Sequence, residues 1–211
     1  MNDYELNSLR YDEALKFDKR TYIEYYFSLL RRKHILVFTF YTNNDYNSKN
    51  IKICLFLFSF ALYYTINALF FDDKTMHKIY IDKGNYNFIY QLPQILYSTI
   101  ISSVINVIIT FLSLSEKLIL KLKNENINKN IIKIKKILII KFVLFFIILF
   151  LFLIFFWYYI SCFCAVYKNT QVYLIKDILI SYGLSLLYPL ILESIPGIFR
   201  IPSLILYIPH K

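Results

Sequence analysis

A row of small polar residues lies inside the apolar stretch 92–114. Its members recur every four or three positions, which places them on one face of an α-helix: Thr99, Ser103, Asn106, Thr110 and Ser113, with Ser98 and Ser102 widening the row. Small hydroxylated side chains let helices approach closely, and an asparagine can hydrogen-bond across their interface. We interpret the row as a helix-packing seam, with Asn67 of a neighbouring apolar stretch as its expected partner. The alternative interpretation is the wall of a water-filled pathway.

Lysines alternate with isoleucines between Lys121 and Lys141, in the string KLKNENINKNIIKIKKILIIK. At helical spacing, Lys129, Lys133 and Lys136 share a face that differs from the face of Ile134 and Leu138. An interfacial helix of this kind would contact anionic lipid headgroups, with each lysine contributing about 1 kcal/mol. The alternative is an ordinary basic loop that stays on the cytosolic side of a membrane.

Residues with catalytic or metal-binding chemistry form no recognised pattern in this sequence. The histidines are isolated, no G-x-S-x-G string occurs, and the three glycines are too far apart to cradle a phosphate. Asp72, Asp73 and His77 cluster, but a zinc site takes a fourth ligand, so we interpret them as the edge of a loop. Three cysteines cannot all pair, so no disulfide framework is expected. We expect no enzyme, no cofactor and no bound metal.

The composition is that of a membrane protein. Of the 211 residues, 58% are hydrophobic and 18% are charged, whereas about a quarter are charged in ordinary soluble domains. About 20 apolar residues are needed for a helix to cross a bilayer. We therefore predict an all-α integral membrane protein with a polar N-terminal segment (1–50) and a helical membrane domain (51–211), whose transmembrane helices cover about 53–71, 92–114, 142–164 and 178–192.

The fourth apolar stretch is short, so three transmembrane helices plus a re-entrant segment is the alternative. Asp177 and Glu193 flank this stretch, and we interpret them as boundary charges within reach of water. Pro93 is expected in the first turn of the second helix. Pro196 and Pro202 are expected to prevent a regular helix in the string IPGIFRIP and to fix the exit of the chain from the bilayer.

The distribution of basic residues predicts the orientation. Residues 116–141 form a basic loop with eight lysines: Lys117, Lys121, Lys123, Lys129, Lys133, Lys135, Lys136 and Lys141. The loop after the first apolar stretch has three: Lys74, Lys78 and Lys83. Because lysine-rich loops stay in the cytosol, both termini are expected there. The net charge of +10 flanks apolar stretches and is not gathered on a compact polar domain, so no nucleic-acid partner is expected.

Several strings resemble a multi-pass membrane module of large uncharacterised protist proteins. They run from about Leu6 to Leu204 and include NDYNSKNIKICLFLFSFALYYTINALFF, YNFIYQLPQILYSTIISSVI, FWYYISCFCAVYKNTQ and SYGLSLLYPLILESIPGIFRIPSL. The resemblance implies a module found at the C-terminal end of surface proteins with repeat-rich extracellular regions. It implies no catalytic or ligand-binding residues.

Two functions are therefore expected from the sequence. The first is a non-enzymatic multi-pass membrane protein that anchors or assembles, through the seam, with a second copy or another membrane partner. The alternative is a subunit of a channel or transporter, in which the same polar row lines a lumen. In both, the lipid bilayer and its anionic headgroups are the expected partners.

Overall fold

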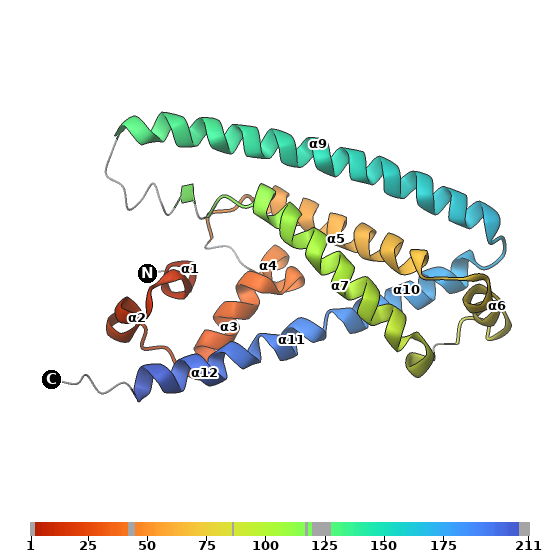
Figure 1. Cartoon of the computed structure of the whole chain (residues 1–211), viewed down its shortest axis with the longest axis horizontal. Coiled ribbons are helices and arrows are strands. Elements are labelled where there is room, and N and C mark those ends of the chain that lie inside the picture. The colour runs from red at the N-terminus through yellow and green to blue at the C-terminus, as the bar shows by residue number, and fades with distance from the viewer. Residues whose placement is uncertain (1–2, 42–44, 86, 117, 120–127, 207–211) are drawn as a thin grey trace.

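The computed structural model describes residues 3–41, 45–85, 87–116, 118–119 and 128–206, and these residues form helices and connecting turns with no strand among them. Four short helices come first: α1 (Asp3–Ser8), α2 (Tyr11–Phe17), α3 (Tyr22–Lys33) and α4 (Ile35–Phe40). The helices that follow are α5 (Lys49–Leu69), α6 (Asp73–Ile81), α7 (Phe88–Ser113), α9 (Asn128–Val166), α10 (Gln171–Ser185), α11 (Tyr188–Leu192) and α12 (Ser194–Ile205). Figure 1 shows α9 lying along α5 and α7, with α6 at one end of the molecule and α1–α4 at the other.

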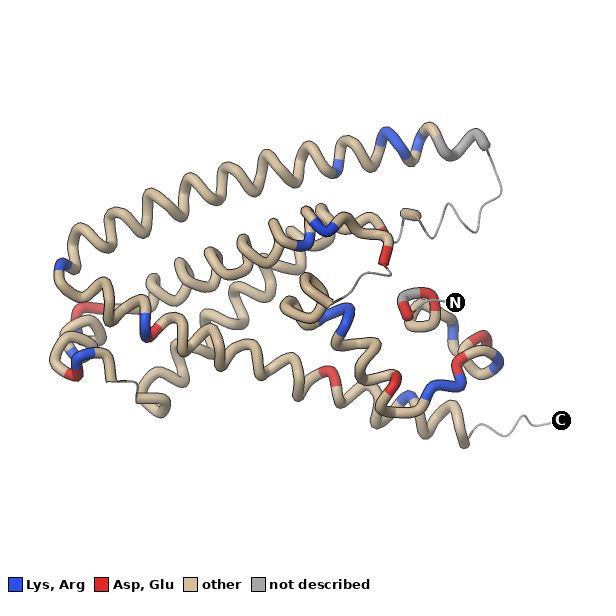
Figure 2. The backbone as a smooth tube through the Cα atoms, turned by 180° about the vertical axis from the view of Figure 1, so that it is seen from behind, with Lys and Arg blue, Asp and Glu red and all other residues tan. Residues whose placement is uncertain are grey.

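Among the described residues, four helical segments are long and apolar enough to cross a membrane, which confirms the predicted all-helical class and the number of long apolar segments. They are Lys49–Leu69, Phe88–Ser113, Ile132–Val166 and Gln171–Ile205. Large apolar side chains of α7 and α9 point away from the rest of the chain, as Ile108, Phe150 and Trp157 do. Soluble monomers rarely expose so large a continuous apolar surface. Figure 2 shows that the middle of α5, α7 and α9 carries no charged residue.

Helix α9 is much longer than the third predicted segment. It begins at Asn128 and has 39 residues, or about 58 Å at 1.5 Å per residue, against a hydrocarbon core of about 30 Å. Residues 128–141 are therefore its first turns, and they form neither a separate interfacial helix nor a loop. The change of composition at Lys141 does not end the helix, because lysine and isoleucine are both compatible with an α-helix.

The fourth segment also extends beyond its predicted bounds. Helices α10, α11 and α12 follow one another closely, and together they form an apolar segment of 35 residues, Gln171–Ile205. The re-entrant alternative rested on a length of fifteen residues, so its argument does not hold. Breaks occur near Leu187 and at Glu193, so the segment is not one straight helix.

The prolines lie inside helices more often than the sequence predicted. Pro93 is the sixth residue of α7 and not part of its first turn. Pro196 lies in the first turn of α12, where a backbone N–H has no acceptor within the helix, and Pro202 lies inside the same helix. The prediction that Pro196 and Pro202 prevent a regular helix was therefore wrong.

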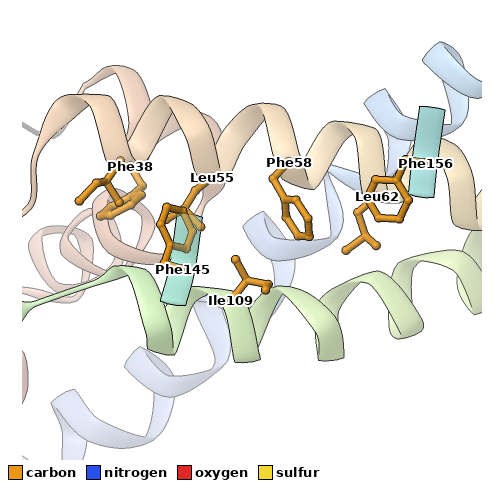
Figure 3. Close-up of a cluster of buried hydrophobic side chains, with 8 residues drawn as sticks. Phe38, Leu55, Phe58, Leu62, Ile109, Phe145 and Phe156 are labelled. Atoms are coloured by element: carbon orange, nitrogen blue, oxygen red, sulfur yellow. The ribbon is translucent and has the colours of Figure 1, made fainter. Parts of the chain in front are cut away.

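The largest buried apolar cluster has α5 at its centre. Leu55, Phe58 and Leu62 of this helix are at most 3% exposed. They pack with Phe38 of α4, Ile109 of α7, and Phe145 and Phe156 of α9 (Figure 3). This cluster holds the inner faces of the long helices together and leaves their outer faces exposed.

The N-terminal helices pack against the C-terminal ones. The hydroxyls of three tyrosines donate to backbone carbonyls there: Tyr11 to Ser203 at 2.9 Å, Tyr22 to Ser194 at 3.2 Å and Tyr26 to Leu190 at 3.1 Å. Gly197 permits the close approach, because a Cβ at this position would lie 2.8 Å from Cε2 of Tyr22. This contact brings α3 alongside α11 and α12, at one end of the long helices (Figure 1).

Candidate functional site

A cavity of about 1080 Å³ lies between α3, α4, α5, α7, the first half of α9, and the α10–α11 junction. We call it the central cavity. Ligand pockets in proteins span roughly 300–1,000 Å³, so it is large enough for an organic ligand. Most of its wall is apolar and comes from side chains such as Phe38, Leu55, Val107, Phe111 and Leu114.

The polar row of α7 forms one wall of this cavity. Thr99, Ser103, Asn106 and Thr110 line it, whereas Ser113 is fully buried and donates to the Thr110 carbonyl at 3.1 Å. Nδ2 of Asn106 donates to Oγ of Ser59 on α5 at 3.0 Å. The structure thus brings the five residues onto one helix face and directs four of them toward a cavity.

The serines of α7 that pack most closely against neighbouring helices come one position before members of the predicted polar row. Ser98 and Ser102 are 0% and 3% exposed, while Thr99 and Ser103 are only half-buried. Asn67 does not pair with the predicted row, because it accepts from Nε2 of Gln94 at 2.7 Å. Within the described part of the chain, Oγ1 of Thr99 and Oγ of Ser102 are buried without a hydrogen-bond partner. Both residues contribute to the lining of the cavity, but these two oxygens themselves are buried.

One end of the central cavity is lined by charged residues. Arg32 and Lys33 come from the end of α3, Lys141 from α9, and Glu116 from the turn after α7. Nζ of Lys141 donates to the Leu114 carbonyl at 2.8 Å and lies 5.3 Å from the ring centroid of Phe111. Lys33 pairs with Glu193 at 2.8 Å. The lining has three cationic side chains and one carboxyl, and Glu193 offsets the charge of Lys33. Arg32 and Lys141 against Glu116 leave this end with a net positive charge, which attracts anions.

A buried polar network holds Glu116 in place. Nδ2 of Asn47 donates to Oε1 of Glu116 at 2.8 Å and to Oδ2 of Asp45 at 3.0 Å. Lys52, only 2% exposed, pairs with Asp45 at 2.5 Å. Burial raises the pKa of Glu116 to about 7, although the charges of Arg32 and Lys52 act in the opposite direction. The charge of this end of the cavity therefore changes near neutral pH.

The lysines predicted to contact lipid, Lys129, Lys133 and Lys136, lie in the first turns of α9. They precede Lys141, whose side chain contacts the end of α7. Lys133 and Lys136 are exposed, and Ile134 between them is buried. The side chain of Lys129 lies outside the described part of the structure. An exposed basic helix at this level is compatible with contact to headgroups.

The cluster of Asp72, Asp73 and His77 lies at the opposite end of the molecule from α1–α4. Asp72 caps α6 by accepting from the Thr75 backbone at 2.8 Å, and these hydrogen bonds hold its pKa below the usual range. Asp73 accepts from the hydroxyl of Tyr167 at 2.6 Å. Within the described residues, no group of three potential ligands is placed to hold a metal ion.

Asp177 is not the exposed boundary charge that the sequence predicted. It is 2% exposed, and Oδ1 accepts a hydrogen bond from Nε2 of Gln91 on α7. Oγ of Ser181, one turn further along α10, donates to Oε1 of Gln91 at 3.4 Å. The only sign in the sequence that Asp177 is buried was its i, i+4 spacing from Ser181, since both are polar residues in an apolar helix. Glu193 does have a charged partner, Lys33, and its side chain is 12% exposed.

Nothing among known protein families, curated proteins or solved structures matches this chain. The resemblance of its strings to a protist membrane module therefore stays a prediction. Inference about function rests on the geometry of the central cavity and of the long apolar helices.

Proposed function

We propose that this chain is a multi-pass integral membrane protein that binds an anionic amphiphile in its central cavity, as a subunit of a transporter would. The observation that carries the proposal is the position of the polar row of α7, which faces a large cavity with a cationic end. Of the two expected functions, this geometry favours the channel-or-transporter class.

The long apolar helices support insertion into a bilayer. Their exposed outer faces would meet lipid, and Trp157 and Tyr158 are exposed near one end of α9, at the level that aromatic belts occupy. Helices α1 and α12 lie at the same end of the molecule (Figure 1), as an even number of crossings requires. The lysines at the start of α9 lie at this end too, so we place it in the cytosol.

The lining of the cavity selects the chemistry of the ligand. Its apolar wall favours an acyl chain, the hydroxyl and amide groups of α7 give a polar strip, and Arg32 and Lys141 can pair with an anionic group. A small inorganic anion would leave the apolar wall uncovered, and a neutral lipid would bring no negative charge to the cationic end.

Assembly through the polar row has less support. Asn106 is already hydrogen-bonded to Ser59 within the chain, and the row faces the cavity and not the outside. The outer face of α9 is exposed along its length, so contacts with lipid or a partner chain would form there.

Native mass spectrometry of the protein released from nanodiscs tests the proposal. The nanodiscs would contain equal amounts of phosphatidylglycerol and phosphatidylcholine with the same acyl chains. We expect one phosphatidylglycerol molecule to be retained per chain, and the Lys141→Gln variant to lose most of it. Lys136→Gln is the matched control, because it removes the same charge from the same helix outside the cavity lining. Equal retention of the two lipids, or none, would refute the proposal.

Binding of the anion should weaken as pH rises through 7. The pKa of Glu116 is raised to about 7, so this carboxyl is mostly neutral at pH 6 and mostly charged at pH 8. Ionisation adds a negative charge to the cationic end and should lower the affinity about three- to tenfold. A titration with a fluorescent fatty acid at both pH values would measure this change. In the Glu116→Gln variant the affinity should be nearly constant between pH 6 and pH 8. If the affinity of this variant falls with pH as much as that of the parent, a group other than Glu116 is responsible.

A further inference from the structure

Asp177 is a buried carboxyl inside an apolar segment, and it has no charged partner in the described structure. The residue is 2% exposed, and the amide of Gln91 provides the hydrogen bond to Oδ1. Oδ2 is buried and has no hydrogen-bond partner among the described residues. An ionised carboxylate in such surroundings is costly to bury, whereas the neutral acid is much less so.

Among the described residues, no lysine, arginine or histidine of the helices packed against α10 forms an ion pair with Asp177. The titratable groups of these helices toward this end of the molecule are Tyr63 and Tyr64 of α5, Tyr90 and Tyr97 of α7, Tyr188 of α11, and Asp73, Lys74, His77, Lys78 and Tyr80 of α6. Tyr159 of α9 lies in the same packed cluster as Ile178 of α10. Nζ of Lys78 lies 3.6 Å from the ring centroid of Tyr90, and the Tyr63 hydroxyl donates to the Ser181 carbonyl at 3.2 Å. On α10 itself, the adjacent Lys176 is exposed.

Asp177 lies one helical turn from the wall of the central cavity. Tyr63 and Tyr182 line the cavity, and Ser181 connects this wall to Gln91 and so to the carboxyl. The three helices that meet at Asp177, namely α5, α7 and α10, are also walls of the cavity. A change in the charge of Asp177 would therefore act on the packing of the cavity itself.

We propose that Asp177 is a proton-binding site within the membrane, next to the inner wall of the central cavity. In the protonated form, the neutral acid keeps the hydrogen bond with Gln91 and holds α7 against α10. Loss of the proton places an unpaired charge between these helices, which favours their separation and the admission of water to the cavity. The inference rests on the surroundings of the carboxyl and does not depend on which ligand the cavity binds.

Infrared spectroscopy of the protein in phosphatidylcholine bilayers tests this site. A protonated carboxylic acid has a carbonyl stretching band that a carboxylate lacks. The measurement uses a Glu116→Gln background, because that carboxyl also titrates near neutral pH. At pH 5 we expect this band in the parent protein, its loss in Asp177→Asn, and its return at a shifted frequency in Asp177→Glu.

Glu193→Gln is the matched control. This residue is the other carboxyl of the fourth apolar segment, but it is paired with Lys33, so the band should be unchanged. Asparagine has the shape of a neutral aspartic acid, so the Asp177→Asn variant is expected to fold. Identical carbonyl regions in the parent and Asp177→Asn at pH 5, with a pH titration of the parent that shows a carboxylate throughout, would overturn the proposal. Neither outcome depends on ligand binding, so failure here would leave the function proposed for the cavity standing.

Discussion

Replacing Asp18 with alanine is expected to destabilise the packing of the N-terminal helices on α12 by about 3–5 kcal/mol, the usual cost of removing one partner from a buried ion pair. The Asp18 side chain is 0% exposed and pairs with Arg20 at 2.7 Å and with Arg200 of α12 at 3.2 Å. Each guanidinium also lies 5.2 Å from the ring centroid of Tyr25. Without the carboxylate, two partly buried cations would face each other across the ring.

Limited proteolysis in bilayers would measure the loss, because undocked helices α1–α3 are cleaved faster. Asp12→Ala is the control, since this residue is exposed on α2 and its removal should change the stability by less than about 0.5 kcal/mol. Burial disfavours the charged form of Asp18, but the hydrogen bonds and charges of the two arginines lower its pKa overall. The ion pair should therefore stabilise the packing of the N-terminal helices on α12 at neutral pH. This stabilisation should be lost only as the carboxylate is protonated below about pH 4. Equal cleavage of Asp18→Ala and Asp12→Ala would contradict the role of the ion pair.

Reversing two charges at the end of the central cavity should have the largest effect on ligand binding. In the double variant Arg32→Glu, Lys141→Glu, we expect the affinity for a fluorescent fatty acid to fall about 100-fold or more, which corresponds to about 2.7 kcal/mol. Both side chains line the cavity, so each reversal replaces attraction of the anion by repulsion.

The matched control for that variant is Lys133→Glu, Lys136→Glu. It makes the same change in net charge, on an exposed face of α9 outside the cavity lining. We expect a change of less than about threefold, because exposed charges at a distance are screened by salt. Similar losses in the two double variants would show that general attraction to the basic surface, and not the cavity, determines binding.

The long apolar segments could be predicted from the sequence because their signal is local. The continuous run after Lys141 forms a helix that is apolar on every face. Such a helix is stable only when lipid or a large protein core surrounds it. Its bounds were less predictable. Helix α9 begins at Asn128, within a lysine-rich stretch. This stretch has the composition of a loop, but its helical propensity is similar to that of the apolar part of α9.

The central cavity could not be predicted, because it depends on contacts between distant parts of the chain. Helices α3 and α4 supply part of its lining, and α3 is held at that end by tyrosine hydroxyls that donate to carbonyls of α11 and α12. Thr99, Ser103, Asn106 and Thr110 lie on one face of α7, but their spacing alone does not say whether that face meets a helix or a cavity. Asp177 was misplaced for the same reason, since the polar partner that buries it, Gln91, is 86 residues away.

Photo-crosslinking with an anionic phospholipid that carries a diazirine in its acyl chain tests the central claim most directly. The protein would be labelled in a bilayer and the adducts located by mass spectrometry. If the cavity holds the acyl chain, adducts will form on Phe38 and Leu55, which line the cavity and are at most 5% exposed, and the Arg32→Glu, Lys141→Glu variant will lose them. Adducts confined to the exposed outer face of α9, such as Phe150 and Phe155, would contradict a binding function for the cavity.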